Sequence, residues 1–99
     1  LEKKKITERD CQRIFVFCMR CFHPEIFTKM ISDTPGMSNS VGYDIILISE
    51  SKTIFIDLKT KKGKKENSQI TLQKELETFE FIEYYFLVCD LERKTFYTI

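Results

Sequence analysis

Apolar side chains recur at three- and four-residue spacing between residues 11 and 22, which is the period of an amphipathic helix. Thr7 followed by Asp10 is typical of a helix N-cap with a returning acid at the third helical position. Pro24 interrupts the pattern, because proline cannot continue a helix. The sequence therefore predicts a helix of about four turns that follows Thr7 and ends before Pro24.

Five shorter segments have the apolar, β-branched or aromatic character of strands. Residues 32–42 form a turn-rich loop after the first of them, and the two-residue turn at 50–51 makes the second and third strands antiparallel. The fourth segment is apolar at nearly every position, which is typical of a strand buried on both faces and paired in parallel. The predicted strands are residues 26–31, 43–49, 52–59, 83–89 and 95–99.

A second helix is predicted between the third and fourth strands. Its apolar stripe comprises Gln69, Leu72, Leu76 and Phe79, and Asn67 or Ser68 is expected to cap its start. The order is α-β-β-β-α-β-β, so we expect an α/β fold with a mixed central sheet flanked by helices.

The composition supports one globular domain that spans residues 1–99. The chain is 42% hydrophobic and 31% charged with a net charge of +1, which excludes collagen-like, mucin-like and broadly disordered chains. Apolar runs are too short for a membrane helix or a secretory signal, so we expect no membrane partner. Three of the four cysteines fall in the first helix, which favours reduced thiols and an intracellular location, in the cytoplasm of a prokaryote or virus-infected cell or in a nucleus.

Charged residues inside the predicted strands are the best candidates for chemistry. Asp44 is the one charge in the second strand, and Asp57 and Lys59 lie two residues apart on the third. Alternation along a strand puts Asp57 and Lys59 on one face, opposite Ile54, Ile56 and Leu58. A carboxylate on a central strand is costly to bury unless it is paired or binds a metal. The ordinary alternative is an ion pair at the strand end, whereas two carboxylates together suit Mg²⁺ or Mn²⁺.

Residues around these strands could extend such a site. The start of the second helix offers free N–H groups to a phosphate, and Gln69 is expected to face the same place. Glu8, in the first turn of the first helix, is a candidate outer ligand, with Gln12 one turn further on. A lysine-rich loop around Gly63 indicates an anionic partner or, alternatively, a merely solvated loop. Its lysines are Lys59, Lys61, Lys62, Lys64 and Lys65.

Three segments together resemble a known family. Gly42-Tyr43-Asp44, the run Ile56–Gly63 and Gln69 are similar to the motifs of the PD-(D/E)XK nuclease superfamily, and most similar to its virus-type replication-repair nuclease (VRR-NUC) branch. This resemblance implies a restriction-endonuclease-like core and a Mg²⁺- or Mn²⁺-dependent endonuclease that acts on DNA in replication or repair. Branched or junction DNA is the implied substrate class, and a homodimer is the implied assembly.

The resemblance also implies roles for single residues. Metal binding would fall to Asp44, Asp57, the backbone carbonyl of Leu58 and, for a second metal or its water shell, Glu8. Lys59 would orient or help to deprotonate the attacking water, and Gln69 would position the lysine, the water or the phosphate. Contacts to the DNA backbone would come from Lys61, Lys62, Lys64 and Lys65.

Two other interpretations stay open. The chain could be a nuclease-fold module without catalysis that binds nucleic acid or protein. Alternatively, Cys18 and Cys21, with His23 nearby, could bind zinc or act as redox thiols, although their spacing favours core packing.

The aromatic residues are expected to be core, and an exposed aromatic face would instead indicate a dimer interface. These aromatics are Phe15, Phe17, Phe22, Tyr84, Tyr85 and Phe86.

Overall fold

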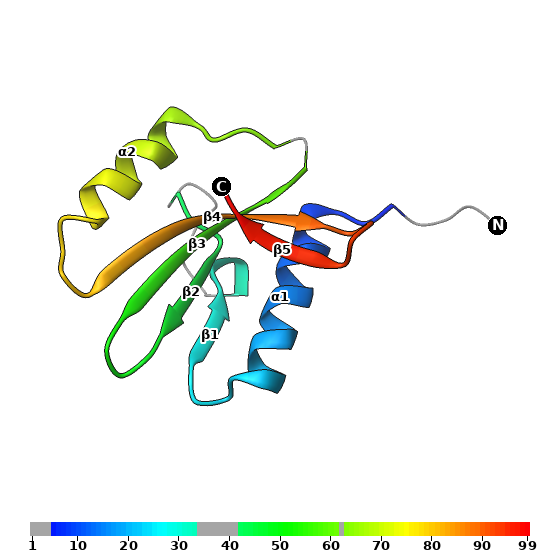
Figure 1. Ribbon diagram of the computed structural model, residues 1–99, viewed down its shortest axis with the longest axis horizontal. Coiled ribbons are helices and arrows are strands. Elements are labelled where there is room, and N and C mark those ends of the chain that lie inside the picture. The colour runs from blue at the N-terminus through cyan, green and yellow to red at the C-terminus, as the bar shows by residue number, and fades with distance from the viewer. Residues whose placement is uncertain (1–4, 34–41, 62) are drawn as a thin grey trace.

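A computed structural model describes residues 5–33, 42–61 and 63–99, and it has helices on either side of a twisted sheet (Figure 1). The elements follow one another in the predicted order, with one short 3₁₀ helix added after the first strand. They are α1 (Glu8–Phe22), β1 (Phe27–Met30), η1 (Ile31–Asp33), β2 (Ile45–Ile48), β3 (Thr53–Thr60), α2 (Asn67–Leu76), β4 (Ile82–Asp90) and β5 (Thr95–Thr98).

The sheet is mixed, as predicted. Its five strands lie in the order β1-β2-β3-β4-β5, and β3 and β4 are its parallel neighbours while every other neighbouring pair is antiparallel. The connection through α2 allows β4 to return beside β3 in the same direction. The α/β class and the mixed sheet are therefore confirmed. No helix in the described part of the chain has the length and apolar character needed to cross a bilayer.

Helix α1 packs its buried side on one face of the sheet. Its predicted N-cap is confirmed, because the Thr7 hydroxyl accepts a hydrogen bond from the Asp10 N–H at 3.2 Å and the Asp10 carboxylate accepts one from the Thr7 N–H at 2.9 Å. Cys11 and Val16 join Ile56 and Leu58 of β3 in the main hydrophobic cluster. Strand alternation then directs Asp57 and Lys59 to the opposite face.

The opposite face carries aromatic side chains of β4 and is covered from the α2 side. Tyr84 and Phe86 are fully buried and pack edge to face, and Phe86 lies opposite Asp57 in the parallel register. The Gln73 side-chain amide of α2 donates a hydrogen bond to the Tyr84 carbonyl at 3.0 Å. The Lys65 ammonium lies 4.7 Å from the centre of the Phe86 ring. Asp57 therefore lies beside buried aromatic side chains of β4.

Several predicted boundaries are wrong by a few residues. The residue that caps α2 is Glu66 rather than Asn67 or Ser68, and the helix ends at Leu76, so Phe79 lies outside it with 59% of its surface exposed. The second strand is shorter than residues 43–49, and Ile31 belongs to η1. The structure covers only the two ends of the predicted loop at 32–42, because residues 34–41 lie outside the described ranges.

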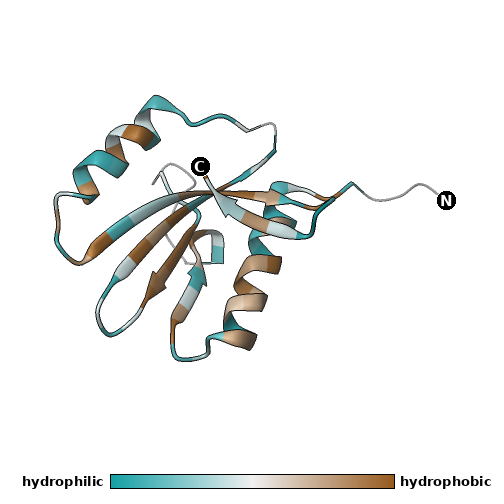
Figure 2. Ribbon diagram, in the orientation of Figure 1, coloured by the Kyte–Doolittle hydropathy of each residue, from teal (hydrophilic) through white to brown (hydrophobic). Residues whose placement is uncertain are grey.

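The prediction that all the aromatics pack in the core is wrong for α1. Phe15 packs against the core, but Phe17 is 68% and Phe22 77% exposed. At 100° per residue, Phe17 points away from the sheet when Val16 points towards it, and Phe22 is the last residue of the helix. Cys21 is exposed as well. Figure 2, coloured by hydropathy, shows that apolar residues occur on successive turns of α1.

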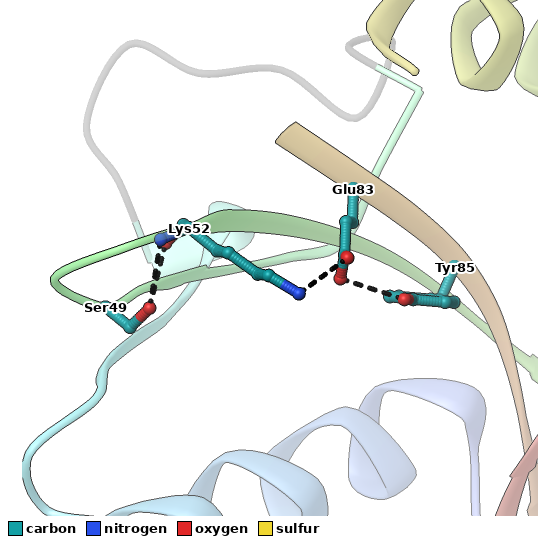
Figure 3. A network of polar contacts seen from close by, with 4 residues as sticks. All are labelled: Ser49, Lys52, Glu83 and Tyr85. Carbon is teal, nitrogen blue, oxygen red and sulfur yellow. Dashed lines mark hydrogen bonds and ion pairs between the residues drawn. The ribbon is translucent and has the colours of Figure 1, made fainter. Parts of the chain in front are cut away.

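Tyr85 is also not a core residue, because it belongs to a polar network that joins the β2–β3 turn to β4 (Figure 3). The Lys52 ammonium lies 2.9 Å from the Glu83 carboxylate, which also accepts a hydrogen bond from the Tyr85 hydroxyl at 2.8 Å. The Ser49 hydroxyl accepts a hydrogen bond from the Lys52 N–H at 3.2 Å and closes the predicted turn. This network fixes the end of the hairpin remote from Asp57.

Candidate functional site

The pairing of β2 with β3 brings two acids side by side. Ile45 lies opposite Ile56, so the same register sets Asp44 opposite Asp57. The Asp44 N–H donates to the Ile56 carbonyl at 2.8 Å, which continues the ladder by one residue. Because paired residues share a face, the two side chains meet, and the Asp57 carboxyl lies within hydrogen-bonding reach of Asp44.

The environment of Asp44 strongly disfavours its ionised form. Its carboxylate accepts a hydrogen bond from the Leu58 N–H at 2.8 Å, which lowers its pKa, but this effect is outweighed. Burial is the largest cause of the opposite shift, and the hydrogen bond and charge of Asp57 and the charge of Glu8 add to it. Together they raise the pKa of Asp44 from 3.8 to about 7. Because Asp57 and Glu8 both disfavour the ionised form of Asp44, the three acids do not all ionise easily.

A buried lysine partly balances these acids. The Lys59 ammonium lies 2.9 Å from Asp57 Oδ2, and Asp57 itself is only 3% exposed. This contact is an ion pair, and Oδ2 makes no hydrogen bond to another described residue. A buried ion pair is costly because both charges lose their water, and buried charged groups of this kind are typical of functional positions.

Helix α1 contributes the third acid. Burial is the main cause that raises the pKa of Glu8, the charge of Asp57 raises it further, and the charge of Lys59 lowers it. These electrostatic interactions place Glu8 in the field of the pair on β3. Glu8 and Asp44 line one cavity, and Asp44 adjoins Asp57 and Lys59, so these four predicted site residues lie in one region of the structure.

Gln69 is not joined to this cluster. Its side-chain oxygen accepts a hydrogen bond from the Glu66 N–H at 3.1 Å, so it caps the start of α2. In the described parts of the chain, no hydrogen bond connects Gln69 to Asp57 or Lys59. Leu58 does adjoin the acids, with its N–H on Asp44 and its side chain fully buried in the core.

The lysine-rich loop is partly neutralised by the protein itself. Lys61 lies 3.5 Å from Asp90 and 3.6 Å from Glu92. Lys65 stacks on Phe86 and donates a hydrogen bond to the Ile99 carbonyl at 3.2 Å. Lys64 is exposed, and Lys62 lies outside the described residues. Of the four predicted DNA contacts, Lys64 is the described lysine without an ion pair or hydrogen bond.

Tyr84 is a residue of the site that sequence reasoning missed, because it resembled an ordinary core aromatic. Its hydroxyl donates a hydrogen bond to the Gly42 carbonyl, two residues before Asp44. Burial, followed by the charges of Asp57 and Asp44, raises the pKa of Tyr84 far above its usual value. The phenol therefore stays neutral, and its hydrogen bond to Gly42 holds the segment that carries Asp44 against β4.

Replacing Tyr84 by Phe is expected to lower the free energy of unfolding by about 1–2 kcal/mol, because the Gly42 carbonyl loses its partner. Urea unfolding measures this loss. The matched control is Tyr97→Phe on β5, where the side chain is exposed and makes no hydrogen bond to another described residue. It is expected to cost less than about 0.5 kcal/mol. Equal effects of the two substitutions would contradict the bracing role of Tyr84.

The cysteines and His23 do not form a cluster comparable with that of the acids and Lys59. All four cysteines have free thiols, and the His23 imidazole lies 3.5 Å from the Glu25 carboxylate. Cys89 contacts Cys11 in the core, and burial raises the pKa of its thiol to about 12. Within residues 5–33, 42–61 and 63–99, no three His, Cys, Asp or Glu side chains are already arranged as a metal centre.

Comparison with known proteins gives no relative for this chain. No family model matches it, and neither does any curated protein or solved structure. What bears on function is the geometry itself, in which two carboxyls within hydrogen-bonding reach, a third acid and a buried ammonium gather at the junction of α1, β2 and β3.

Proposed function

We propose that this chain is a metal-dependent endonuclease that hydrolyses phosphodiester bonds of DNA. The observation that carries the proposal is the convergence of Asp44, Asp57 and Lys59 on one face of β2 and β3. An ion pair at a strand end needs one acid and one lysine. Asp44 is a second acid beside this pair, and its surroundings raise its pKa. Its presence lowers the stability of the free protein, which is typical of a site that binds a ligand.

The residues present fit a hard divalent cation. Asp57 Oδ2 is buried and makes no hydrogen bond to another described residue. Asp44 and Glu8 provide further carboxylate oxygens nearby, and oxygen atoms of this kind are the ligands that such cations prefer. Asp44, Asp57 and the Leu58 carbonyl would hold Mg²⁺ or Mn²⁺, with Glu8 as an outer ligand. When bound, the cation would lower the pKa of a coordinated water and neutralise charge on the scissile phosphate.

The chain's own residues supply the rest. Asp57 holds the Lys59 ammonium in place, since the two groups are 2.9 Å apart and both are buried. In this weakly screened position, Lys59 can hold the attacking water and stabilise negative charge that develops on the phosphate. Lys64 is free to contact the DNA backbone, whereas Lys61 would first have to leave Asp90 and Glu92. Lys62 keeps its proposed role but lies outside the described residues.

We further propose that the chain has a restriction-endonuclease-like core of the replication-repair type, is intracellular, cuts branched DNA and forms a homodimer. The exposed apolar side chains of α1 support the homodimer. Ile14 and Phe17 are 41% and 68% exposed and lie three residues apart, on one side of the helix.

Cleavage of labelled single-stranded, duplex, flap and four-way-junction DNA tests the function. We expect hydrolysis with Mg²⁺ or Mn²⁺, strongest on a branched substrate, and none after chelation. Calorimetric titration with Mn²⁺ is the companion measurement. If no substrate is cut and Mn²⁺ does not bind, the proposal is wrong and a nuclease-fold module without catalysis is favoured.

A further inference from the structure

A cavity of about 270 Å³ lies beside the acid cluster, between the first turns of α1, η1 and the segment that precedes β2. Glu8 and Asp44 belong to both the cavity wall and the cluster. The rest of the wall includes Arg9, Gln12 and Tyr43. A ligand in this cavity would therefore touch the candidate site directly.

Gln12 is the decisive residue of the wall. Its side chain lines the cavity although the residue is only 9% exposed, and its amide makes no hydrogen bond to any other described residue. Among the described residues, Asp57 Oδ2 is the buried side-chain polar atom without a partner, so the Gln12 amide keeps contact with solvent in the cavity and is available to a ligand there. The amide presents both a donor and an acceptor, so it suits a ligand edge that offers both as well.

The other lining residues narrow the class of ligand. Glu8 and Asp44 repel a free phosphate, which excludes a simple anion site. Ile31 and the Tyr43 ring provide apolar and aromatic surface for a flat, uncharged group. The exposed Arg9 guanidinium provides one positive charge. A planar polar base with an attached phosphate matches this combination.

From these contacts we propose that the cavity takes one unpaired nucleotide of a DNA strand, next to the bond that is cut. The Gln12 amide hydrogen-bonds the edge of the base, Tyr43 contacts its ring, and Arg9 pairs with the adjoining phosphate. The choice of DNA rests on the proposed function. The volume is below the range of about 300–1,000 Å³ that is usual for ligand pockets, so a single nucleotide fits better than a longer segment.

The recessed position of Gln12 is the reason for an unpaired nucleotide. In duplex DNA the edges of a base lie inside the grooves, and its faces are covered by stacked neighbours. A base must leave the stack to reach a side chain that is 9% exposed. Leaving the stack costs least where the base is already unpaired. The cavity thus favours strands that are single or that branch from a duplex.

Fluorescence anisotropy with a labelled single-stranded oligonucleotide and a blunt duplex of the same sequence tests this inference, with Ca²⁺ replacing Mg²⁺. We expect Gln12→Leu to weaken single-strand binding about tenfold, since the base edge loses its partner, and to change duplex binding less than about twofold. Gln12→Glu keeps the shape but removes the donors, and it should have the same effect. The control is Arg13→Met, an exposed cation on α1 outside the cavity wall, which should bind both DNAs as the wild type does.

The outcomes separate this inference from the nuclease proposal. If both folded Gln12 variants bind single strands as tightly as the wild type, the cavity proposal is wrong, whether or not the protein cuts DNA. If no DNA is cut but single-strand binding depends on Gln12, the cavity proposal stands and the nuclease proposal fails. Far-UV circular dichroism of each variant verifies that the fold is intact.

Discussion

Replacing Asp57 by Asn is expected to lower the rate of metal-dependent DNA cleavage by about 10³-fold or more. The substitution keeps the size of a side chain that is 3% exposed, but it removes the charge that pairs with Lys59 and the oxygen that has no hydrogen bond. Metal binding and the placement of Lys59 therefore fail together. Lys59→Met should cause a loss of similar size in rate but should leave Mn²⁺ binding in place.

Initial cleavage rates at saturating Mg²⁺ measure the first effect, and calorimetry with Mn²⁺ separates the two variants. Glu50→Gln is the matched control, because Glu50 is an exposed acid in the β2–β3 turn, far along the strand from Asp57. It should cleave at the wild-type rate. Cleavage by a folded Asp57→Asn variant at the wild-type rate would reject this site.

The parts of the fold that the sequence predicted well are those in which local chemistry and packing agree. Thr7 and Asp10 form their cap within four residues, so no distant contact is needed. The alternation along β3 places Ile56 in the core and Asp57 on the other face, because the pleat allows no other arrangement. These features depend on short-range geometry.

The predicted helix boundaries are wrong where contacts with distant parts of the chain determine the structure. Phe79 continues the apolar spacing of α2, but the chain must leave the helix after Leu76 to return beside β3 as β4. Glu66 takes the cap position, and the Gln69 side-chain oxygen accepts a hydrogen bond from the Glu66 N–H. Periodicity identifies an apolar position but not the length of the helix that its neighbours permit.

The candidate site was predictable from its acids and lysine but not from its supports. Asp44, Asp57 and Lys59 are conspicuous because charge inside an apolar strand is costly. Tyr84 and Gln12 are inconspicuous in the sequence, since a tyrosine in an apolar strand and a glutamine on a helix are both common. Their importance depends on long-range partners, Gly42 and the cavity, which only the folded chain reveals.

Replacing Asp44 by Asn is expected to remove most of the pH dependence of stability that the metal-free protein has between about pH 4 and pH 7. In the folded protein the pKa of Asp44 is about 7, against 3.8 for an ordinary aspartate. Between these values the folded state holds a proton that the unfolded state releases, so the free energy of unfolding falls as the pH rises. Asn does not titrate, and its side-chain oxygen can still accept the hydrogen bond from Leu58.

At pH 8 the Asp44→Asn variant should therefore be more stable than the metal-free wild type by about 1–3 kcal/mol, after allowance for solvent screening and for the shared titration with Asp57. Near pH 4 the two proteins should differ little. Urea unfolding in chelator measures both differences, and Glu50→Gln should follow the wild-type profile. Added Mn²⁺ should stabilise the wild type at pH 8 and not Asp44→Asn, because a cation favours the ionised carboxylates that the free protein resists. If the wild type instead gains stability between about pH 4 and pH 7, burial and the neighbouring acids do not raise the pKa of Asp44 in the folded protein.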